Sequence, residues 1–167
     1  MMERITDQQI EKGLQMLRSL QDGKLMTHVN SCVHCGLCGE SCLYYLANKE
    51  AKFLPAMKVD LVSSVYKRYF TFTGRVFPKL INARDLDQET TEEMVDLLFG
   101  ACTMCGRCNI HCSIGVDIAF LVRIGRMMLT EMGLTPATLQ STVNAALTTG
   151  NNMGITKEEF VDTLNWL

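Results

Sequence analysis

The sequence lacks the motifs by which many enzymes hold nucleotides, flavins or a catalytic zinc ion. No G-x-x-x-x-G-K-[ST] loop, no G-x-G-x-x-G fingerprint and no H-E-x-x-H pair occurs in its 167 residues. We therefore expect no catalytic site in this chain, and we expect any substrate chemistry to lie in another polypeptide.

Long apolar runs and a strong charge bias are also missing. The uncharged apolar stretches fall far short of the length that crosses a bilayer, so no membrane-spanning segment is expected. A net charge of −2 gives no reason to expect nucleic acid as a partner. The chain opens MMERITDQQI, without the apolar core of a signal peptide, which indicates a reducing, cytoplasmic location.

Strand signals are sparse, with little two-residue alternation and no Asn-Gly hairpin flanked by apolar runs. Helix signals recur instead, as capping residues and prolines at starts and glycines at stops. These signals are the boxes Thr6–Gln9, Thr90–Glu93 and Thr156–Glu159, the starts Pro55, Asp117 and Thr135-Pro136, and the stops Gly23, Gly100 and Gly133. The sequence predicts an all-α fold, with helices over residues 6–21, 42–49, 55–70, 90–100 and 118–132 and two more from residues 136 and 156.

Cysteine occurs only eight times, and all eight fall in two runs of identical C-x2-C-x2-C-x3-C spacing. The first run is CVHCGLCGESC, and the second, 70 positions later, is CTMCGRCNIHC. The runs contain Cys32, Cys35, Cys38 and Cys42, and Cys102, Cys105, Cys108 and Cys112.

This spacing is that of proteins with two [4Fe–4S] clusters, in which the fourth cysteine of each run serves the other cluster. Gly36 and Gly106 permit the tight turns that such loops need. We therefore predict two [4Fe–4S] clusters with crossed ligands. The predicted ligand sets are Cys32, Cys35, Cys38 and Cys112 for the first cluster, and Cys102, Cys105, Cys108 and Cys42 for the second.

Three other interpretations of the cysteines remain open: disulfides, structural zinc and chance spacing. Disulfides fit a reducing location poorly, and structural zinc usually takes two C-x2-C pairs separated by a longer finger. Chance would have to produce the spacing twice. His34 and His111 lie inside the runs, but every ligand position is already cysteine, so we expect them at the surface or beside the ligands.

One departure and three nearby cations complete the motif. Leu43 and Ser113 stand where proline usually follows the fourth cysteine, which argues against a simple bacterial ferredoxin more than against the clusters. Arg107, Lys49 and Lys52 are candidates for offsetting the negative charge of the clusters, or they are simply solvated.

The 59 residues between the two runs are mostly helix-like, unlike the short insert of a compact carrier. The least regular part, residues 71–89, is expected to be a surface loop or a partner-docking loop. The predicted helices 55–70 and 118–132 are apolar over wide arcs, about 220° for the second. Such helices lie either at the centre of their own domain or against another subunit.

Paired cysteine runs on a helical scaffold resemble the α-helical ferredoxin family. This fold is shared by the dicluster iron–sulfur subunit of heterodisulfide reductase and by the iron–sulfur subunits of succinate dehydrogenase and fumarate reductase. The stretch CTMCGRCNIHCSIGVDI is most similar to the heterodisulfide reductase branch, in which glycine, valine and aspartate follow the last cysteine, here Gly115, Val116 and Asp117. The resemblance covers approximately residues 31–133.

The resemblance implies an electron-transfer subunit with two [4Fe–4S] clusters in a heterodisulfide-reductase-like oxidoreductase complex. Its implied partners are a flavoprotein subunit and a cysteine-rich catalytic subunit, and some relatives join membrane-associated complexes. Residues 1–133 would form the dicluster domain and residues 134–167 a helical connector or tail. A fused domain of a larger oxidoreductase, a free-standing dicluster carrier and a redox or oxygen sensor are the alternatives.

Overall fold

The computed structural model describes residues 4–166, and in this range every regular element is a helix, as the sequence predicts. The elements in chain order are α1 (Asp7–Ser19), α2 (Gly23–Ser31), η1 (Leu37–Ser41), α3 (Leu43–Asn48), η2 (Ala51–Phe53), α4 (Pro55–Phe70), α5 (Phe72–Val76), η3 (Pro78–Ile81), α6 (Gln88–Met94), η4 (Val95–Gly100), α7 (Arg107–Ile110), α8 (Ile118–Glu131), α9 (Ala137–Thr149) and α10 (Lys157–Trp166).

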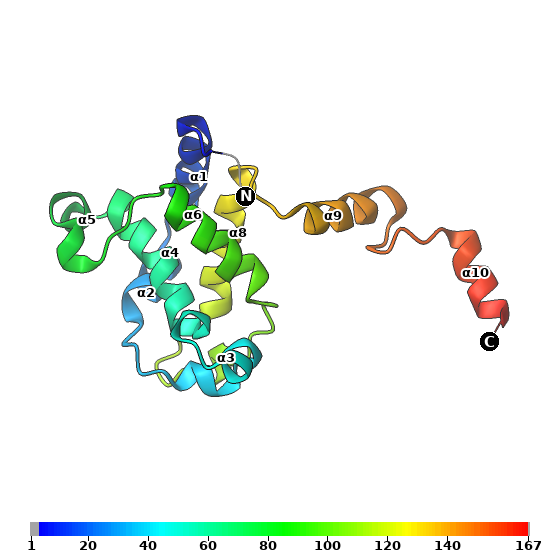
Figure 1. Cartoon of the computed structure of the whole chain (residues 1–167), viewed down its shortest axis with the longest axis horizontal. Coiled ribbons are helices and arrows are strands. Elements are labelled where there is room, and N and C mark those ends of the chain that lie inside the picture. Colours follow the sequence, from blue (N-terminus) through cyan, green and yellow to red (C-terminus); the bar gives the residue numbers. More distant parts are fainter. Residues whose placement is uncertain (1–3, 167) are drawn as a thin grey trace. The chain divides into compact units, whose positions relative to one another are not determined.

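The helices group into two compact units, Met1–Leu134 and Thr135–Leu167. All eight cysteines belong to the first unit. Both cysteine loops lie at one end of this unit, beside α3 and the first turns of α4 and α8 (Figure 1).

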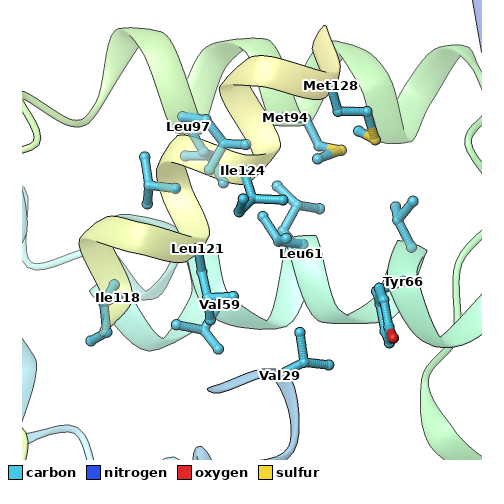
Figure 2. Packing of buried hydrophobic residues seen from close by; sticks show 14 of the residues in the cluster. Val29, Val59, Leu61, Tyr66, Met94, Leu97, Ile118, Leu121, Ile124 and Met128 are labelled. Carbon is cyan, nitrogen blue, oxygen red and sulfur yellow. The ribbon is translucent and has the colours of Figure 1, made fainter. Parts of the chain in front are cut away.

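The two widely apolar helices, α4 and α8, pack against each other at the centre of the first unit (Figure 2). Buried side chains of both helices meet those of α2, α6 and η4 in one hydrophobic cluster. Their wide apolar arcs are therefore explained by burial within the unit. Of the residues in the predicted arc of α8, Met127 stays exposed.

Gly125 allows the close approach of α8 to its neighbours. A Cβ at this position would lie 2.5 Å from Cδ1 of Leu98 and 3.0 Å from Cγ2 of Val62. Both of those side chains are buried, so they have little room to move. The absence of a side chain here lets α4, α8 and η4 share one core.

The first helix begins as predicted and ends earlier. Both arms of the Thr6–Gln9 capping box are present, and α1 ends at Ser19, with Leu20 as its C-cap. Gly23 does not stop a helix, so that prediction was wrong. It is the first residue of α2, whose N-cap Asp22 accepts a hydrogen bond from the Leu25 N–H.

The helix before the second cysteine run begins at a different cap from the one predicted. Asp87, not Thr90, is the N-cap of α6, and its Oδ1 accepts from the Thr90 N–H at 2.8 Å. This hydrogen bond lowers the pKa of Asp87. Thr90 is buried inside the helix, which continues as the π-helical turn η4 to Gly100, the predicted end.

Residues 71–89 contain more regular structure than predicted. Thr71 caps the short helix α5, and η3 follows after Phe77. Four large apolar side chains of this segment, Phe72, Val76, Phe77 and Leu80, are exposed. The segment is therefore an ordered surface feature with apolar residues at its tip.

The second unit consists of α9 and α10 joined by a turn. The Asn151 carboxamide oxygen accepts from the N–H groups of Met153 and Ile155 within the turn. The predicted Thr156–Glu159 box opens α10. Neither helix has a buried residue. Leu167, where the last helix was predicted to stop, lies outside the described residues.

No helix within residues 4–166 has both the length and the apolar character needed to span a bilayer.

Candidate functional site

The two cysteine loops have left-handed residues at the same two positions, although a 3₁₀ helix follows in the first loop and an α-helix in the second. His34 and Met104, each two residues after the first cysteine of its run, both have φ of 56°. Gly36 and Gly106 follow with φ of 83° and 74°, in the left-handed region that glycine adopts without steric cost. The repeated spacing in the sequence is therefore accompanied by a repeated pair of left-handed positions. The non-glycine residues in this region are held there at a cost in free energy.

Four cysteines from both runs line one pocket, which we call the first cysteine pocket. It has an empty volume of about 320 Å³ and is bordered by residues of η1, α4 and the start of α8. The cysteines that line it are Cys32, Cys35, Cys38 and Cys112. The structure thus brings the four residues predicted to hold the first cluster to the same pocket.

The other four cysteines line a second cysteine pocket, of about 490 Å³. Its walls come from α3, α4, α7 and α8. The cysteines that line it are Cys42, Cys102, Cys105 and Cys108. Each pocket therefore receives three cysteines from one run and the last cysteine of the other.

The two pockets share a wall. Ile118, the first residue of α8, lines both of them. Cys38 of the first pocket is also close enough to Cys108 of the second for its charge to raise the pKa of that thiol. Two groups bound in these pockets would be separated by little more than one side chain.

Crowding and burial make both pockets poor environments for thiolates that have no cation beside them. Burial, followed by the neighbouring Cys102, raises the pKa of Cys108 to about 12. Burial also raises the pKa of Cys32 and of Cys38. Cys105 differs, because the Arg107 N–H lowers its pKa. Four thiolates so close together need a cationic core to balance them, and the irons of a cluster supply one.

None of the eight cysteines forms a disulfide. Among residues 4–166 no group of three or more His, Cys, Asp or Glu side chains is arranged around a single metal ion. A cubane cluster makes a different demand, because each of its four irons takes one thiolate and the ligands stand at separate corners.

Backbone N–H groups point at the cysteine sulfur atoms. The Val116 N–H lies 3.2 Å from Sγ of Cys112, and the Met104 N–H lies 3.4 Å from Sγ of Cys102. Such hydrogen bonds stabilise negative charge on sulfur and are among the levers by which a protein sets a cluster's potential. Met104, which has a left-handed backbone conformation, is therefore one of the residues whose N–H group donates to a cysteine sulfur.

Lys58 is a residue of the second pocket that the motif does not reveal. It lines this pocket from α4 and is 2% exposed, and its Nζ donates to the Phe53 carbonyl oxygen at 3.1 Å. A sequence signal existed, because Lys58 interrupts the apolar surface of the 55–70 helix. Within the described residues no carboxylate forms an ion pair with it. A buried ammonium without a counter-charge fits a pocket that holds an anionic group.

Arg126 reaches the same region from α8. Its guanidinium donates to the carbonyl oxygens of Leu98 and Cys102. Burial lowers the pKa of Arg126, and the nearby Cys102 opposes this effect. Of the cations named from the sequence, Arg107 lines the second pocket but is exposed, whereas Lys49 and Lys52 are exposed and pack over Tyr45 and Phe53.

A carboxylate lies behind the wall of the first pocket instead. His34 lines this pocket, and its Nε2 contacts Oδ1 of Asp60 on α4. Asp60 contributes, after burial, to the raised pKa of Cys32. His111 is exposed, as expected for a histidine that is not a ligand.

Asp117 joins the second cysteine loop to α8. As the N-cap of α8 it accepts from the Phe120 N–H at 2.9 Å, and it also accepts from Nδ2 of Asn109 at 2.6 Å. Burial raises the pKa of Asp117, but these hydrogen bonds and Lys24 outweigh it and hold the pKa below its usual value. The Asp117 N–H donates to Nδ1 of His28, a contact that the sequence did not predict.

The helical fold and the paired cysteine loops define a class, that of helical iron–sulfur domains. Residues 28–116 match the 4Fe-4S dicluster domain, and this chain belongs to that family. The match contains both cysteine runs in full.

Relatives with known names agree with this family. The chain is 37% identical to the "Hdr-like menaquinol oxidoreductase iron-sulfur subunit" of Archaeoglobus profundus over 124 residues. These residues are 74% of this chain and 22% of the relative. It is 35% identical to "Hdr-like menaquinol oxidoreductase iron-sulfur subunit 2" of Archaeoglobus fulgidus, again over 124 residues, which are 74% of this chain and 22% of the relative.

The chain is also similar, at lower identity, to a subunit of a heterodisulfide reductase. One subunit of the "Dihydromethanophenazine:CoB--CoM heterodisulfide reductase" of Methanosarcina mazei is 25% identical over 142 residues, which are 85% of this chain and 33% of the relative. The chain thus spans between about a fifth and a third of these relatives. No solved structure is significantly similar to it.

Proposed function

We propose that this chain relays electrons through two [4Fe–4S] clusters as the iron–sulfur part of a heterodisulfide-reductase-like oxidoreductase. The observation that carries the proposal is the pair of adjoining pockets, each lined by four cysteines. When bound, each cluster accepts and releases one electron without rearranging bonds in the protein.

The crossed ligand sets suit a relay. Cys42 and Cys112 each tie one loop to the pocket of the other, so the two pockets are held at a fixed separation. Ile118 is buried and lines both pockets, so they adjoin each other at this side chain. A fixed and short separation favours electron transfer between the two clusters.

The similarity to heterodisulfide-reductase-like oxidoreductases also suggests the partners. We propose a cysteine-rich catalytic subunit or domain as one partner and a flavoprotein as the other, so that the chain passes single electrons between them. The names of the two Archaeoglobus relatives favour a second candidate for the donor, a menaquinol-oxidising protein at a membrane. The partial coverage of these relatives also favours a chain that works as one domain of a larger assembly.

Metal analysis tests the clusters. The anaerobically purified chain should contain about eight irons and eight inorganic sulfides, four of each per cube. Stoichiometric zinc with about two irons or fewer would contradict the proposal.

Affinity purification from the native host under anaerobic conditions tests the partners. A co-purifying cysteine-rich protein, together with flavin absorbance, supports the flavoprotein-linked complex, and a co-purifying membrane protein without flavin supports the quinol-linked one. A cluster-loaded chain that elutes alone and monomeric at high concentration would instead indicate a free-standing carrier.

A further inference from the structure

The two cysteine pockets differ in the charges that surround them. The second pocket has the buried Lys58 in its wall and Arg126 bonded to the carbonyl group of one of its cysteines. The first pocket has Asp60 beside Cys32, in contact with His34. Lys58 and Asp60 both belong to α4, two residues apart; Lys58 lines the second pocket, whereas Asp60 lies behind the first pocket, in contact with its lining residue His34.

Lys58 lies very near one of the thiols of the second pocket. Its Nζ is 3.1 Å from the Phe53 carbonyl oxygen, and Sγ of Cys42 is 3.9 Å from the same oxygen. The ammonium and the sulfur are therefore at most about 7 Å apart, a range over which charges interact strongly in the low effective dielectric of a protein interior.

Among the described residues no carboxylate forms an ion pair with Lys58. Its Nζ donates to the Phe53 carbonyl oxygen and lies 5.9 Å from the centroid of the Tyr44 ring. Water cannot screen it, because the side chain is 2% exposed. The field of this ammonium is directed at whatever the four thiols of the second pocket hold.

Adding an electron makes a thiolate-ligated cluster more negative. A buried cation beside one pocket therefore favours the reduced state there, and a carboxylate beside the other pocket opposes it. Arg126 acts in the same direction as Lys58, but it is also anchored to two carbonyl groups of the fold, so Lys58 is the cleaner determinant.

We propose that Lys58 makes the cluster bound by Cys42, Cys102, Cys105 and Cys108 the one with the higher reduction potential. An electron that reaches the cluster of the first cysteine pocket then moves to the cluster of the second, where it is more stable. The step is the movement of one electron: the cluster of the first pocket is oxidised, that of the second is reduced, and no bond or proton is exchanged. This inference rests on the proposed function.

An EPR-monitored redox titration of the anaerobic, cluster-loaded chain tests the proposal. In Lys58→Met, the higher of the two potentials should fall by about 59 mV, the equivalent of a tenfold change in a one-electron equilibrium constant. The lower potential should stay within about 15 mV of its original value, a quarter of that change. Lys58→Gln, which retains a donor for the Phe53 carbonyl, should show the same fall.

Two further variants separate charge from position. Lys58→Arg retains the charge and should keep the higher potential near that of the parent chain. Lys52→Met removes a charge from the same segment, but Lys52 is exposed and pairs with Glu50 at 3.3 Å, so both potentials should stay in place. Should either cluster fail to assemble in Lys58→Met, the comparison between Lys58→Gln and Lys58→Arg still isolates the charge.

The proposal is overturned if Lys58→Gln changes neither potential, if it moves the lower one, or if Lys52→Met has an equal effect. Iron and sulfide are measured on every sample before the titration. A parent chain without two clusters contradicts the proposed function, whereas full clusters with unaltered potentials contradict only the role of Lys58.

Discussion

At the level of single residues, the crossed arrangement of the cysteines makes a prediction that pairs of substitutions can test. Cys112 belongs to the second run but lines the pocket of the first. If Cys112 and Cys35 bind the same cluster, the double variant Cys112→Ala/Cys35→Ala should lose one cluster and retain about four irons. Cys112→Ala/Cys105→Ala should lose both clusters and retain almost none.

Iron and sulfide analysis after anaerobic purification measures the difference. The two double variants are matched controls for each other, because each removes two thiols. The reverse pattern, with the Cys105 pair retaining half the iron, would mean that each run binds its own cluster.

Some residues of the site could be predicted from the sequence, and others could not. Ligand spacing and the turn glycines are local properties, so the cysteines, Gly36 and Gly106 are visible in the sequence. Lys58 reaches the second pocket, and Asp60 reaches His34 of the first, through the packing of α4, which brings together residues far apart in the chain. Their charges stand out inside an apolar helix, but only the fold shows which pocket each one faces.

Asp87 gives a prediction about a helix end. Asp87→Ala removes the N-cap of α6 and should lower the free energy of unfolding by about 1 kcal/mol. Asp87→Ser retains an acceptor for the Thr90 N–H and should lose much less. The urea midpoint of the cluster-loaded chain measures both, and an equal loss in the two variants would show that the capping hydrogen bond is not the cause.

The pH dependence of this effect follows from the lowered pKa of Asp87. A carboxylate with a lowered pKa stabilises the fold above its unfolded pKa of about 3.9, and that contribution is lost as the pH falls through the folded value. The difference between Asp87→Ala and the parent chain should therefore be constant from pH 6 to pH 8. A difference that changes across this range would require another titrating group.

At the level of helices, the packing of α8 leads to a prediction about Gly125. Gly125→Val places three carbon atoms where a single Cβ would already meet Leu98 at 2.5 Å. Overpacking of this kind costs about 1 to 3 kcal/mol. Valine gains only a few tenths of a kcal/mol in helix propensity over glycine, which is too little to offset that cost.

Gly23→Val is the matched control, because a Cβ at Gly23 meets no atom within 4 Å. Its effect on the free energy of unfolding should stay within about 0.5 kcal/mol. The thermal midpoints of the two cluster-loaded variants provide the comparison. Equal midpoints would mean that the core around Gly125 is loose enough to accept the larger side chain.

Helices were predictable where a local signal marks them, and less so where tertiary contacts decide. Pro55 opens α4 as predicted, because proline at a first helical position needs no partner elsewhere. Thr90 has the sequence of a cap, but the buried surface of α6 extends one turn further, and Asp87 takes that role. The start of α2 was missed because a glycine after α1 has the same appearance as a helix stop.

For the whole molecule, the structure predicts that cluster binding belongs to the first unit alone. We propose that residues 1–133 are the dicluster domain and residues 134–167 a connector. All eight cysteines lie in the first of the two compact units, and α9 and α10 contain no buried residue. A chain that ends at Leu134 should retain about eight irons by the rule of four per cube. Its two potentials should match those of the full chain.

A slightly shorter chain provides the control for that truncation. Ending the chain at Met128 removes Leu129 and Met132, which are 0% and 1% exposed, and it removes the Met132 carbonyl oxygen that accepts from Nε2 of Gln9 on α1. This second truncation should lose iron and unfold at lower temperature, because α1 then has less of α8 to pack against. If the chain that ends at Leu134 lost iron as well, residues 135–167 would be part of the cluster domain and not a connector to the next part of a larger assembly.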